Sequence, residues 1–284
     1  MFNIFGCPIH VGVGVKGLTY SLDYLKSHYK NLDIDVIPEV ILPEEALPNL
    51  KNLNSVIATC NSIAMHQANV LKKGELPLLI AGDHSSVMGS VSASSVAYKN
   101  LGMIYVDAHP DINTDATTVS GNIHGMPVAA LLGMGEEKLT KFLTEDVKLD
   151  AKNIVMIGLR DIDPPEAVFL EKLNIKYYTY DMVVAKGLDE CLAESVAYLS
   201  HLDAVHISFD IDSMNPELMP GVSVPVKSGL TIEETYTLFD TFLSELPIVS
   251  LDIVEFNVDY DIDNKTSDFV SDLVSFITTH KKYQ

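Results

Sequence analysis

Short apolar runs alternate with amphipathic segments along almost the whole chain. The apolar runs predict strands at residues 2–6, 32–37, 76–82, 101–107, 153–159, 175–180, 204–210 and 248–256. The amphipathic segments predict helices at residues 18–29, 54–73, 86–99, 126–133, 164–173, 189–202, 231–246 and 265–280. Alternating strands and helices are typical of a parallel sheet covered on both faces. We therefore expect an α/β fold with three αβα layers and a parallel sheet of about eight strands.

Local signals indicate where some elements begin and end. Asn54 or Ser55 is expected to cap the helix that starts there, and Gly74 is expected to end it. The segment 38–54 contains three prolines, which predict a loop or a short irregular excursion. No linker or repeat divides the sequence, so we expect a single domain over residues 1–284.

Composition and charge narrow the function classes. The chain is 47% hydrophobic and 20% charged, as in soluble globular proteins, and its formal charge of −20 argues against nucleic acid or a membrane as a partner. Three widely spaced cysteines, Cys7, Cys60 and Cys191, are expected to be buried, inert thiols. A basic N-terminal leader and an 18-residue apolar run are both lacking, which predicts a cytoplasmic protein.

Acidic and histidine residues follow five of the predicted strands. They are Asp83 and His84, then Asp107, His109 and Asp111, then Asp161 and Asp163, then Asp210 and Asp212, and finally Glu255. The carboxyl ends of parallel strands share one edge of a sheet, and ligands bind at that edge. Residues two apart on a strand face the same side, so Asp107, His109 and Asp111 can point at one spot.

Carboxylates packed this closely need positive charge among them. Two divalent cations would supply it, and the candidate ligands are His84, Asp107, His109, Asp111, Asp210 and Asp212. An oxygen-rich set favours Mn²⁺ over zinc, although spacing alone leaves iron, cobalt and zinc open. Each motif taken alone is more often a cap or a turn, but three strand ends with compatible ligands favour a two-metal site.

The same residues lie in motifs that resemble those of the ureohydrolases, the family of arginases and agmatinases. The motifs are GDHS at 82–85, DAHPDINT at 107–114, SGNIHGMPVA at 120–129, IGLRDIDPPE at 157–166, SFDID at 208–212 and SLDIVEFN at 250–257. They occur in the family's order over nearly the whole chain. The resemblance implies an arginase-like fold, two Mn²⁺ ions per subunit, and hydrolysis of L-arginine to L-ornithine and urea by a hydroxide that bridges the ions.

The resemblance also implies the role of each ligand. One manganese would be held by His84, Asp107, Asp111 and Asp210, and the other by Asp107, His109, Asp210 and Asp212. Asp107 and Asp210 would bridge the two ions. His124 would transfer a proton to the leaving amine, and Glu255 would orient the guanidinium group by charge-assisted hydrogen bonds.

Substrate choice depends on the segment that follows the ligands of the fourth predicted strand. It resembles the arginase version, in which Asn113 and Ser120, helped by Thr118, would bind the substrate carboxylate while Asp163 faces the ammonium group. Thr118 could instead merely cap a turn. An agmatinase, or a ureohydrolase for another guanidino compound, is the alternative. The expected partner is a small molecule, and the resemblance implies a homo-oligomer, either a trimer or a hexamer.

Four positions depart from the family pattern. Ala81 stands where glycine is common, and Ser213 and Asn215 stand where glycine or cysteine and aspartate are usual, which would alter the loop after the metal ligands. Val224 stands where threonine is usual near the guanidinium site. Loss of that hydroxyl would weaken the polar network around Glu255 and shift substrate choice or rate.

A glycine motif near the N-terminus supports a different class of protein. Gly12, Gly14 and Gly17 form GxGxxG between an apolar run and a predicted helix, with Asp33 or Asp35 about 20 residues on. This context predicts an NAD-binding oxidoreductase, although the same glycines also match a ureohydrolase loop. Two further alternatives are a non-catalytic relative, which the complete set of site residues counts against, and a phosphoesterase, for which basic residues are scarce.

Overall fold

Eight parallel strands form one sheet in the computed structural model, which describes residues 1–283. The strands are β1 (Phe2–Cys7), β2 (Asp35–Val36), β3 (Leu76–Ala81), β4 (Leu101–Val106), β5 (Ile154–Leu159), β6 (Lys176–Thr179), β7 (Ala204–Asp210) and β8 (Ile248–Val254). Their order across the sheet is β2-β1-β3-β8-β7-β4-β5-β6. The predicted parallel sheet of about eight strands is confirmed.

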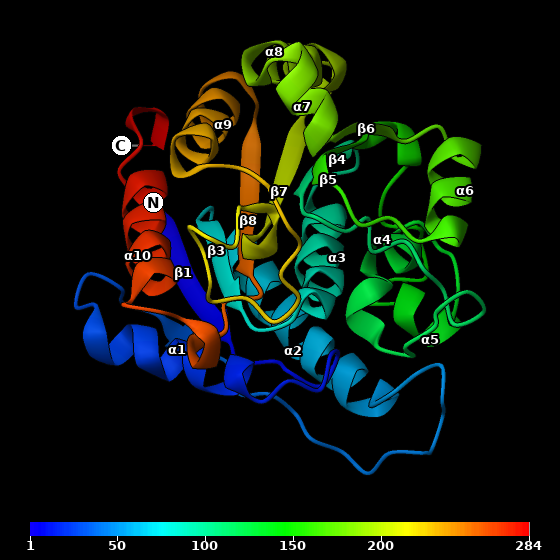
Figure 1. Cartoon of the computed structure of the whole chain (residues 1–284). Coiled ribbons are helices and arrows are strands. Elements are labelled where there is room, and N and C mark those ends of the chain that lie inside the picture. The colour runs from blue at the N-terminus through cyan, green and yellow to red at the C-terminus, as the bar shows by residue number, and fades with distance from the viewer. Residues whose placement is uncertain (284) are drawn as a thin grey trace.

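Helices cover both faces of this sheet (Figure 1). They are α1 (Gly17–His28), α2 (Leu53–Lys72), α3 (Val87–Ala97), α4 (Pro127–Leu131), α5 (Glu137–Thr140), α6 (Pro164–Lys172), α7 (Tyr180–Lys186), α8 (Leu188–Leu199), α9 (Ile232–Glu245) and α10 (Lys265–Thr278). Apolar side chains of α1, α8, α9 and α10 pack on one face of the sheet. Those of α2, α3, α4 and α6 pack on the other. The three αβα layers are therefore as predicted.

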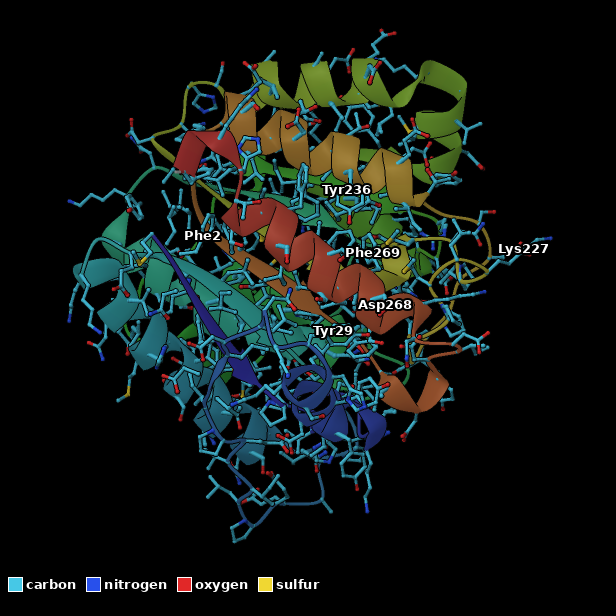
Figure 2. All side chains as sticks on the ribbon, turned by 90° about the vertical axis from the view of Figure 1, so that its left-hand side faces the viewer. Phe2, Tyr29, Lys227, Tyr236, Asp268 and Phe269 are labelled. Atoms are coloured by element: carbon cyan, nitrogen blue, oxygen red, sulfur yellow. The ribbon has the colours of Figure 1, made fainter. Side chains whose placement is uncertain are left out.

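Polar and aromatic contacts join the helices of the α10 side (Figure 2). Tyr29, just after α1, donates a hydrogen bond of 2.6 Å to Asp268 on α10. Tyr236 on α9 meets Phe269 on α10 edge to face, with ring centroids 6.0 Å apart. These contacts fix the layer that supports β8 and β7 from one side.

The central strands are rich in apolar residues because both of their faces are covered. Every residue of β4, β5, β7 and β8 is buried, as expected where helices cover both faces of a parallel sheet. Cys7, Cys60 and Cys191 are buried free thiols, which confirms their predicted burial. None of the helices within residues 1–283 is long and apolar enough to cross a membrane.

The predicted cap of α2 is wrong, although the predicted helix start at residue 54 differs from the observed start by only one residue. Neither Asn54 nor Ser55 is the cap, because the helix begins at Leu53 after Asn52, which has a left-handed φ of 56° and makes no side-chain capping bond. The carboxylate of Glu44 instead accepts hydrogen bonds from the backbone N–H groups of Asn54 and Ser55, at 3.0 and 2.7 Å. A residue on the preceding loop therefore satisfies the free amides that a local cap would have bound.

Other boundaries follow the sequence signals more closely. α2 ends at Lys72, and Gly74 has the positive φ of 74° that favours glycine at such a stop. The segment between β2 and α2 is irregular, as its prolines predicted. Two short helices, α5 and α7, were not predicted. α7 starts directly after β6, where the hydroxyl of Thr179 accepts a hydrogen bond from the Met182 amide.

Strand register brings four strand ends to the same level. Val106 of β4 pairs with Phe209 of β7, Phe209 pairs with Ile253 of β8, and Ile253 pairs with Ile80 of β3. The residues that follow these four adjacent strands therefore share one stretch of the carboxyl edge. All of the predicted ligands lie at the end of β7 or follow β3, β4 or β7.

Candidate metal centre

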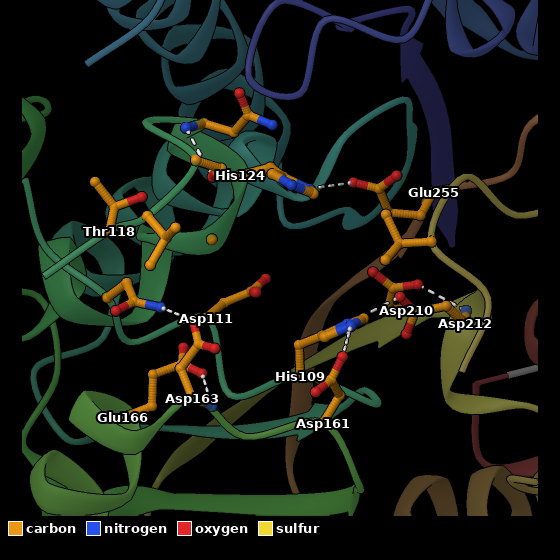
Figure 3. Close-up of a pocket in the computed structure, with 16 residues that line it drawn as sticks. His109, Asp111, Thr118, His124, Asp161, Asp163, Glu166, Asp210, Asp212 and Glu255 are labelled. Atoms are coloured by element: carbon orange, nitrogen blue, oxygen red, sulfur yellow. Dashed lines mark hydrogen bonds and ion pairs between the residues drawn. The ribbon is translucent and has the colours of Figure 1, made fainter. Parts of the chain in front are cut away.

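A pocket opens at the carboxyl edge of the sheet, where β4, β5, β7 and β8 end, and Figure 3 shows the residues that line it. Its volume is about 310 Å³, and its wall includes His109, Asp111, His124, Asp210 and Glu255. Short 3-10 helices at 84–86 and 211–213 turn the chain immediately after β3 and β7. The chain therefore leaves each strand abruptly and keeps the ligand-type side chains at the sheet edge.

The first group of ligand-type atoms surrounds His84. Its Nδ1 atom lies 2.9 Å from Asp107 Oδ2, 3.1 Å from Asp210 Oδ2 and 3.4 Å from Asp111 Oδ2. The ligand atoms of His84, Asp107 and Asp111 all lie within 4.8 Å of one another, and all three residues are buried. This group can hold one metal ion.

The second group surrounds His109 and shares Asp107 with the first. His109 Nδ1 lies 3.1 Å from Asp212 Oδ2 and 3.4 Å from Asp107 Oδ1. The ligand atoms of Asp107, His109 and Asp212 again lie within 4.8 Å of one another. Because the two oxygens of Asp107 face the two histidines, this carboxylate lies between the two groups.

The chemistry of these groups fits divalent cations. Asp107 Oδ2 is buried and accepts no hydrogen bond, so it is available as a ligand. Burial, followed by repulsion from Asp212 and Asp107, raises the pKa of Asp210 well above its usual range. Burial, followed by repulsion from Asp107, raises the pKa of Asp111 to about 7. Cations among the carboxylates would remove this repulsion.

Neighbouring side chains orient His84. Its Nε2 atom lies 2.8 Å from the hydroxyl of Ser208 on β7. A hydrogen bond from Nε2–H to Ser208 selects the tautomer whose Nδ1 lone pair faces the carboxylates. On the other side of His84, the ring of Tyr105 on β4 stacks with a centroid separation of 4.6 Å. The imidazole is thus presented to the carboxylates in one orientation.

His124 and Glu255 form a pair on the wall above the ligand groups (Figure 3). Their Nδ1 and Oε1 atoms lie 3.1 Å apart, and the same Glu255 oxygen accepts a hydrogen bond of 3.0 Å from the His84 amide. Burial opposes protonation of His124, but the hydrogen bond and charge of Glu255 outweigh it and raise the His124 pKa to about 9. His124 is therefore an imidazolium at neutral pH in the absence of metal.

Two site residues have left-handed backbone conformations. Asp111 has a φ of 49° and Glu255 has a φ of 64°. Such a conformation costs roughly 1 kcal/mol for a residue other than glycine. The Glu255 amide donates a 2.7 Å hydrogen bond to the carbonyl of Gly82, which holds this turn in place. The backbone strain is retained where it aims these two carboxylates at the pocket.

The outer wall of the pocket carries the residues predicted to bind the substrate. Asn113, Thr118, Ser120 and Asp163 all line it. The side-chain amide of Asn113 donates a 3.1 Å hydrogen bond to the carboxylate of Asp163. Thr118 does cap a turn, because its hydroxyl accepts a hydrogen bond from the Gly121 amide at 3.0 Å, and Ser120 accepts one from Asn122 at 3.1 Å. A hydroxyl that accepts in this way can still donate its own proton to a ligand.

Sequence reasoning missed one acidic residue of the pocket. Glu166 lines the wall and is buried, and its carboxylate accepts hydrogen bonds from the amides of Ile112 and Asp163 at 3.1 and 3.0 Å. Burial raises its pKa to about 8. Its signal in the sequence was the capping-box spacing of Asp163 and Glu166 at the start of α6, which identifies a helix start but not a pocket residue.

Three of the positions that depart from the family pattern lie in the loop after β7 or in the pocket wall. Ser213 is buried, and its hydroxyl donates a 2.6 Å hydrogen bond to the carbonyl of the ligand candidate Asp210. Asn215 accepts a hydrogen bond from the Glu217 amide at 3.0 Å. Both residues therefore hold the loop together through local bonds. Val224 lines the pocket and is 38% exposed, so it presents an apolar surface to a ligand.

A single arginine holds the loop after β7 by hydrogen bonds to its carbonyl groups. Arg160, the one arginine in the sequence, donates hydrogen bonds to the carbonyls of Asp212, Ser213 and Met214 at 2.6, 3.0 and 3.2 Å. The planar guanidinium can serve several carbonyls at once, which an ammonium group cannot do with the same geometry. This places the loop that carries Asp212.

Close packing explains two glycines of the GxGxxG motif without a bound dinucleotide. The Gly12 amide donates a 2.8 Å hydrogen bond to Asp83, and a Cβ at Gly12 would overlap the Asp83 carboxylate. A Cβ at Gly17 would overlap Asn257. A dinucleotide pyrophosphate needs such amides and would be repelled by an acid beside them. These contacts favour the explanation of the motif as a packed loop.

Comparisons with known proteins agree with this geometry. The sequence model of the Arginase family matches residues 10–279. The arginase of Bacillus subtilis strain 168 is 36% identical over 291 aligned residues, which cover 98% of each chain. The arginase of Bacillus caldovelox is 35% identical over 93% of each chain. A solved structure of the Bacillus caldovelox arginase superposes with a TM-score of 0.90 at 33% identity, covering 98% of each chain.

Proposed function

The chain belongs to the arginase family, and from this premise we propose that it hydrolyses L-arginine to L-ornithine and urea. The observation that carries the proposal is the pair of ligand groups that share Asp107 at the base of the pocket. The His124–Glu255 pair lies beside them, and hydrogen-bonding side chains line the outer wall. The guanidinium group of arginine would lie beside the ligand groups, and its carboxylate and ammonium groups would lie at the outer wall.

We propose that the pocket holds two Mn²⁺ ions per subunit. The ligands of one would be His84, Asp107, Asp111 and Asp210, and those of the other Asp107, His109, Asp210 and Asp212. Four aspartates carry the charge that two divalent cations balance. When bound, the ions supply Lewis acidity and lower the pKa of a coordinated water toward neutrality.

The remaining site residues then have distinct tasks in the proposed reaction. Glu255 binds the guanidinium by charge-assisted hydrogen bonds and holds its carbon in one orientation. The carbon–nitrogen bond to the ornithine side chain must break, and the departing nitrogen needs a proton. His124 is held by Glu255 as a proton donor beside the ligand groups.

The outer wall supports arginine over agmatine. Asn113, Ser120 and Thr118 offer uncharged donors, which stabilise a carboxylate without a bound counter-cation. Asp163 offers an acceptor for the α-ammonium group. Agmatine has no carboxylate and would leave those donors unpaired. The alternative of another guanidino substrate rests on Val224, whose apolar side chain faces the pocket.

The test is urea release by the Mn²⁺-loaded protein from L-arginine and agmatine at equal concentration. We expect kcat/KM to be at least ~100-fold higher for arginine, since a site built for hydrogen bonds rejects an analogue that lacks the partner group. Protein stripped of metal by a chelator serves as the control and should release no urea. Faster release from agmatine would disprove the arginine assignment, and no release from either compound would disprove the activity.

Substitution His124→Asn is expected to lower kcat by ~100-fold or more and to remove the alkaline limb of its pH profile. The proton-donating form exists below the His124 pKa, which is about 9 without metal, and bound cations move it lower. In the wild type kcat should therefore fall as pH rises through that value. The profile of kcat between pH 6 and 10 checks this, with His28→Asn, an exposed histidine on α1, as the control. An unchanged limb in His124→Asn would assign the proton transfer elsewhere.

We further propose that the protein acts in the cytoplasm as a homo-oligomer, a trimer or a hexamer. The proposal rests on the family resemblance. Sedimentation equilibrium measures the assembly directly, and a monomer at micromolar concentration would contradict it.

A further inference from the structure

Tyr105 touches two members of the first ligand group with one side chain. It lies on β4 two residues before Asp107 and is fully buried. Its hydroxyl donates a 2.7 Å hydrogen bond to Asp111 Oδ2 and lies 3.0 Å from His84 Nδ1. Its ring lies parallel to the His84 ring, with an interplanar angle of 6°. The phenol therefore borders the place where the first ion would bind.

We propose that Tyr105 is a positioning residue for the first of the two metal sites. Its hydroxyl fixes the carboxylate of Asp111, and its ring fixes the plane of His84, so that both ligands face one ion. This inference rests on the proposed metal centre, and it adds a residue outside the ligand set to the control of metal affinity.

The other aspartates of the centre show why Asp111 needs this partner. Asp107 is held by the His109 amide at 2.7 Å, Asp210 by the Asp212 amide at 2.7 Å, and Asp212 by the Ala108 amide at 3.2 Å. These three aspartates are therefore oriented by the backbone.

Asp111 is oriented differently. Within residues 1–283 its carboxylate accepts its hydrogen bond from Tyr105 and none from a backbone amide. It also follows the strand on a loop, in the left-handed conformation described above. Without the phenol hydroxyl this carboxylate would rotate more freely, and ordering it would reduce the affinity for the ion.

A buried tyrosine also needs a partner for its hydroxyl, so the test must separate metal positioning from general packing. Tyr105→Phe keeps the ring, its volume and the stacking on His84, and removes only the hydroxyl. Tyr178→Phe is the matched control, because Tyr178 is also buried but lies on β6, outside the pocket lining. Its hydroxyl also donates a 2.7 Å hydrogen bond to a carboxylate, that of Glu194 on α8.

The measurement is Mn²⁺ binding, by elemental analysis of the dialysed protein and by competition with a chelator. We expect the wild type and Tyr178→Phe each to bind two ions, and the affinities of the two proteins for Mn²⁺ to be equal. Tyr105→Phe should bind one ion as tightly as the wild type and the other ~10- to 100-fold more weakly. At saturating Mn²⁺ the KM for arginine should not change, while the Mn²⁺ concentration for half-maximal activity should rise by a similar factor.

A spectroscopic measurement on the wild type gives an independent result. Titration with Mn²⁺ should perturb the ultraviolet absorption of one buried tyrosine, and this signal should be missing in Tyr105→Phe and present in Tyr178→Phe. Equal Mn²⁺ affinity in the wild type and Tyr105→Phe, together with the same difference spectrum, would overturn the role of Tyr105. A wild type that binds fewer than two ions would instead overturn the metal centre of the proposed function.

Discussion

The Asp107→Ala variant is expected to lose both metal ions and to lower kcat/KM for urea release by at least ~10³-fold. Asp107 faces His84 with one oxygen and His109 with the other, at 2.9 and 3.4 Å. Its Oδ2 atom is buried and accepts no hydrogen bond, so it is available to a cation beside His84. Removal of this one side chain takes a ligand from each group and a unit of negative charge from between two cations. Elemental analysis and a urea assay on the same sample measure both losses.

The control for Asp107→Ala must remove the same charge without touching the pocket. Asp272 is exposed on α10, and Asp272→Ala should keep two Mn²⁺ ions and the wild-type rate. A full complement of manganese in Asp107→Ala would refute the shared-ligand assignment. Manganese retained together with activity would also refute the proposed reaction centre.

Much of this site could be predicted because strand ends determine where it lies. The apolar runs that end at His84, Asp107 and Asp210 each identify a buried strand followed by a ligand-type residue. In a parallel sheet this pattern brings the residues to a common edge whatever the order of the strands. Spacing of two then places Asp107 and His109 on one side. The prediction therefore needed only the fold class and the strand ends.

Contacts that depend on strand order or on long loops could not be predicted in this way. Tyr105 lies within an apolar run that predicts only a buried strand, since nothing in one sequence shows that β4 lies three strands from β3 in the sheet and that Tyr105 stacks on His84. The cap of α2 comes from Glu44 on a loop with no regular structure. Glu166 carried a helix-start signal, and its place in the pocket follows from where α6 packs.

The Glu255→Gln variant is expected to keep both metal ions and to lower kcat/KM for arginine by ~10²- to 10³-fold. Glutamine has the shape of glutamate, and its side-chain oxygen can still accept the 3.0 Å hydrogen bond from the His84 amide. What it loses is the negative charge that would bind the guanidinium. Manganese content equal to the wild type, with a reduced kcat/KM, separates this effect from damage to the metal centre. Glu245→Gln, a change of the same charge at an exposed residue on α9 outside the pocket lining, is the control and should leave kcat/KM unaltered.

The same substitution should also move the pH profile, and the sign follows from the His124–Glu255 contact. Burial lowers the His124 pKa, and Glu255 reverses this by its hydrogen bond and charge, raising it to about 9 without metal. With glutamine at 255 the charge is gone, so burial should bring the His124 pKa back toward or below its ordinary value of about 6.5. The proton-donating form would then be lost at neutral pH, and the alkaline limb of kcat should shift to lower pH. Loss of guanidinium binding alone would lower kcat/KM at every pH without moving that limb. A fall in kcat/KM with a stationary limb would therefore leave Glu255 as a substrate ligand and disprove its hold on the His124 proton.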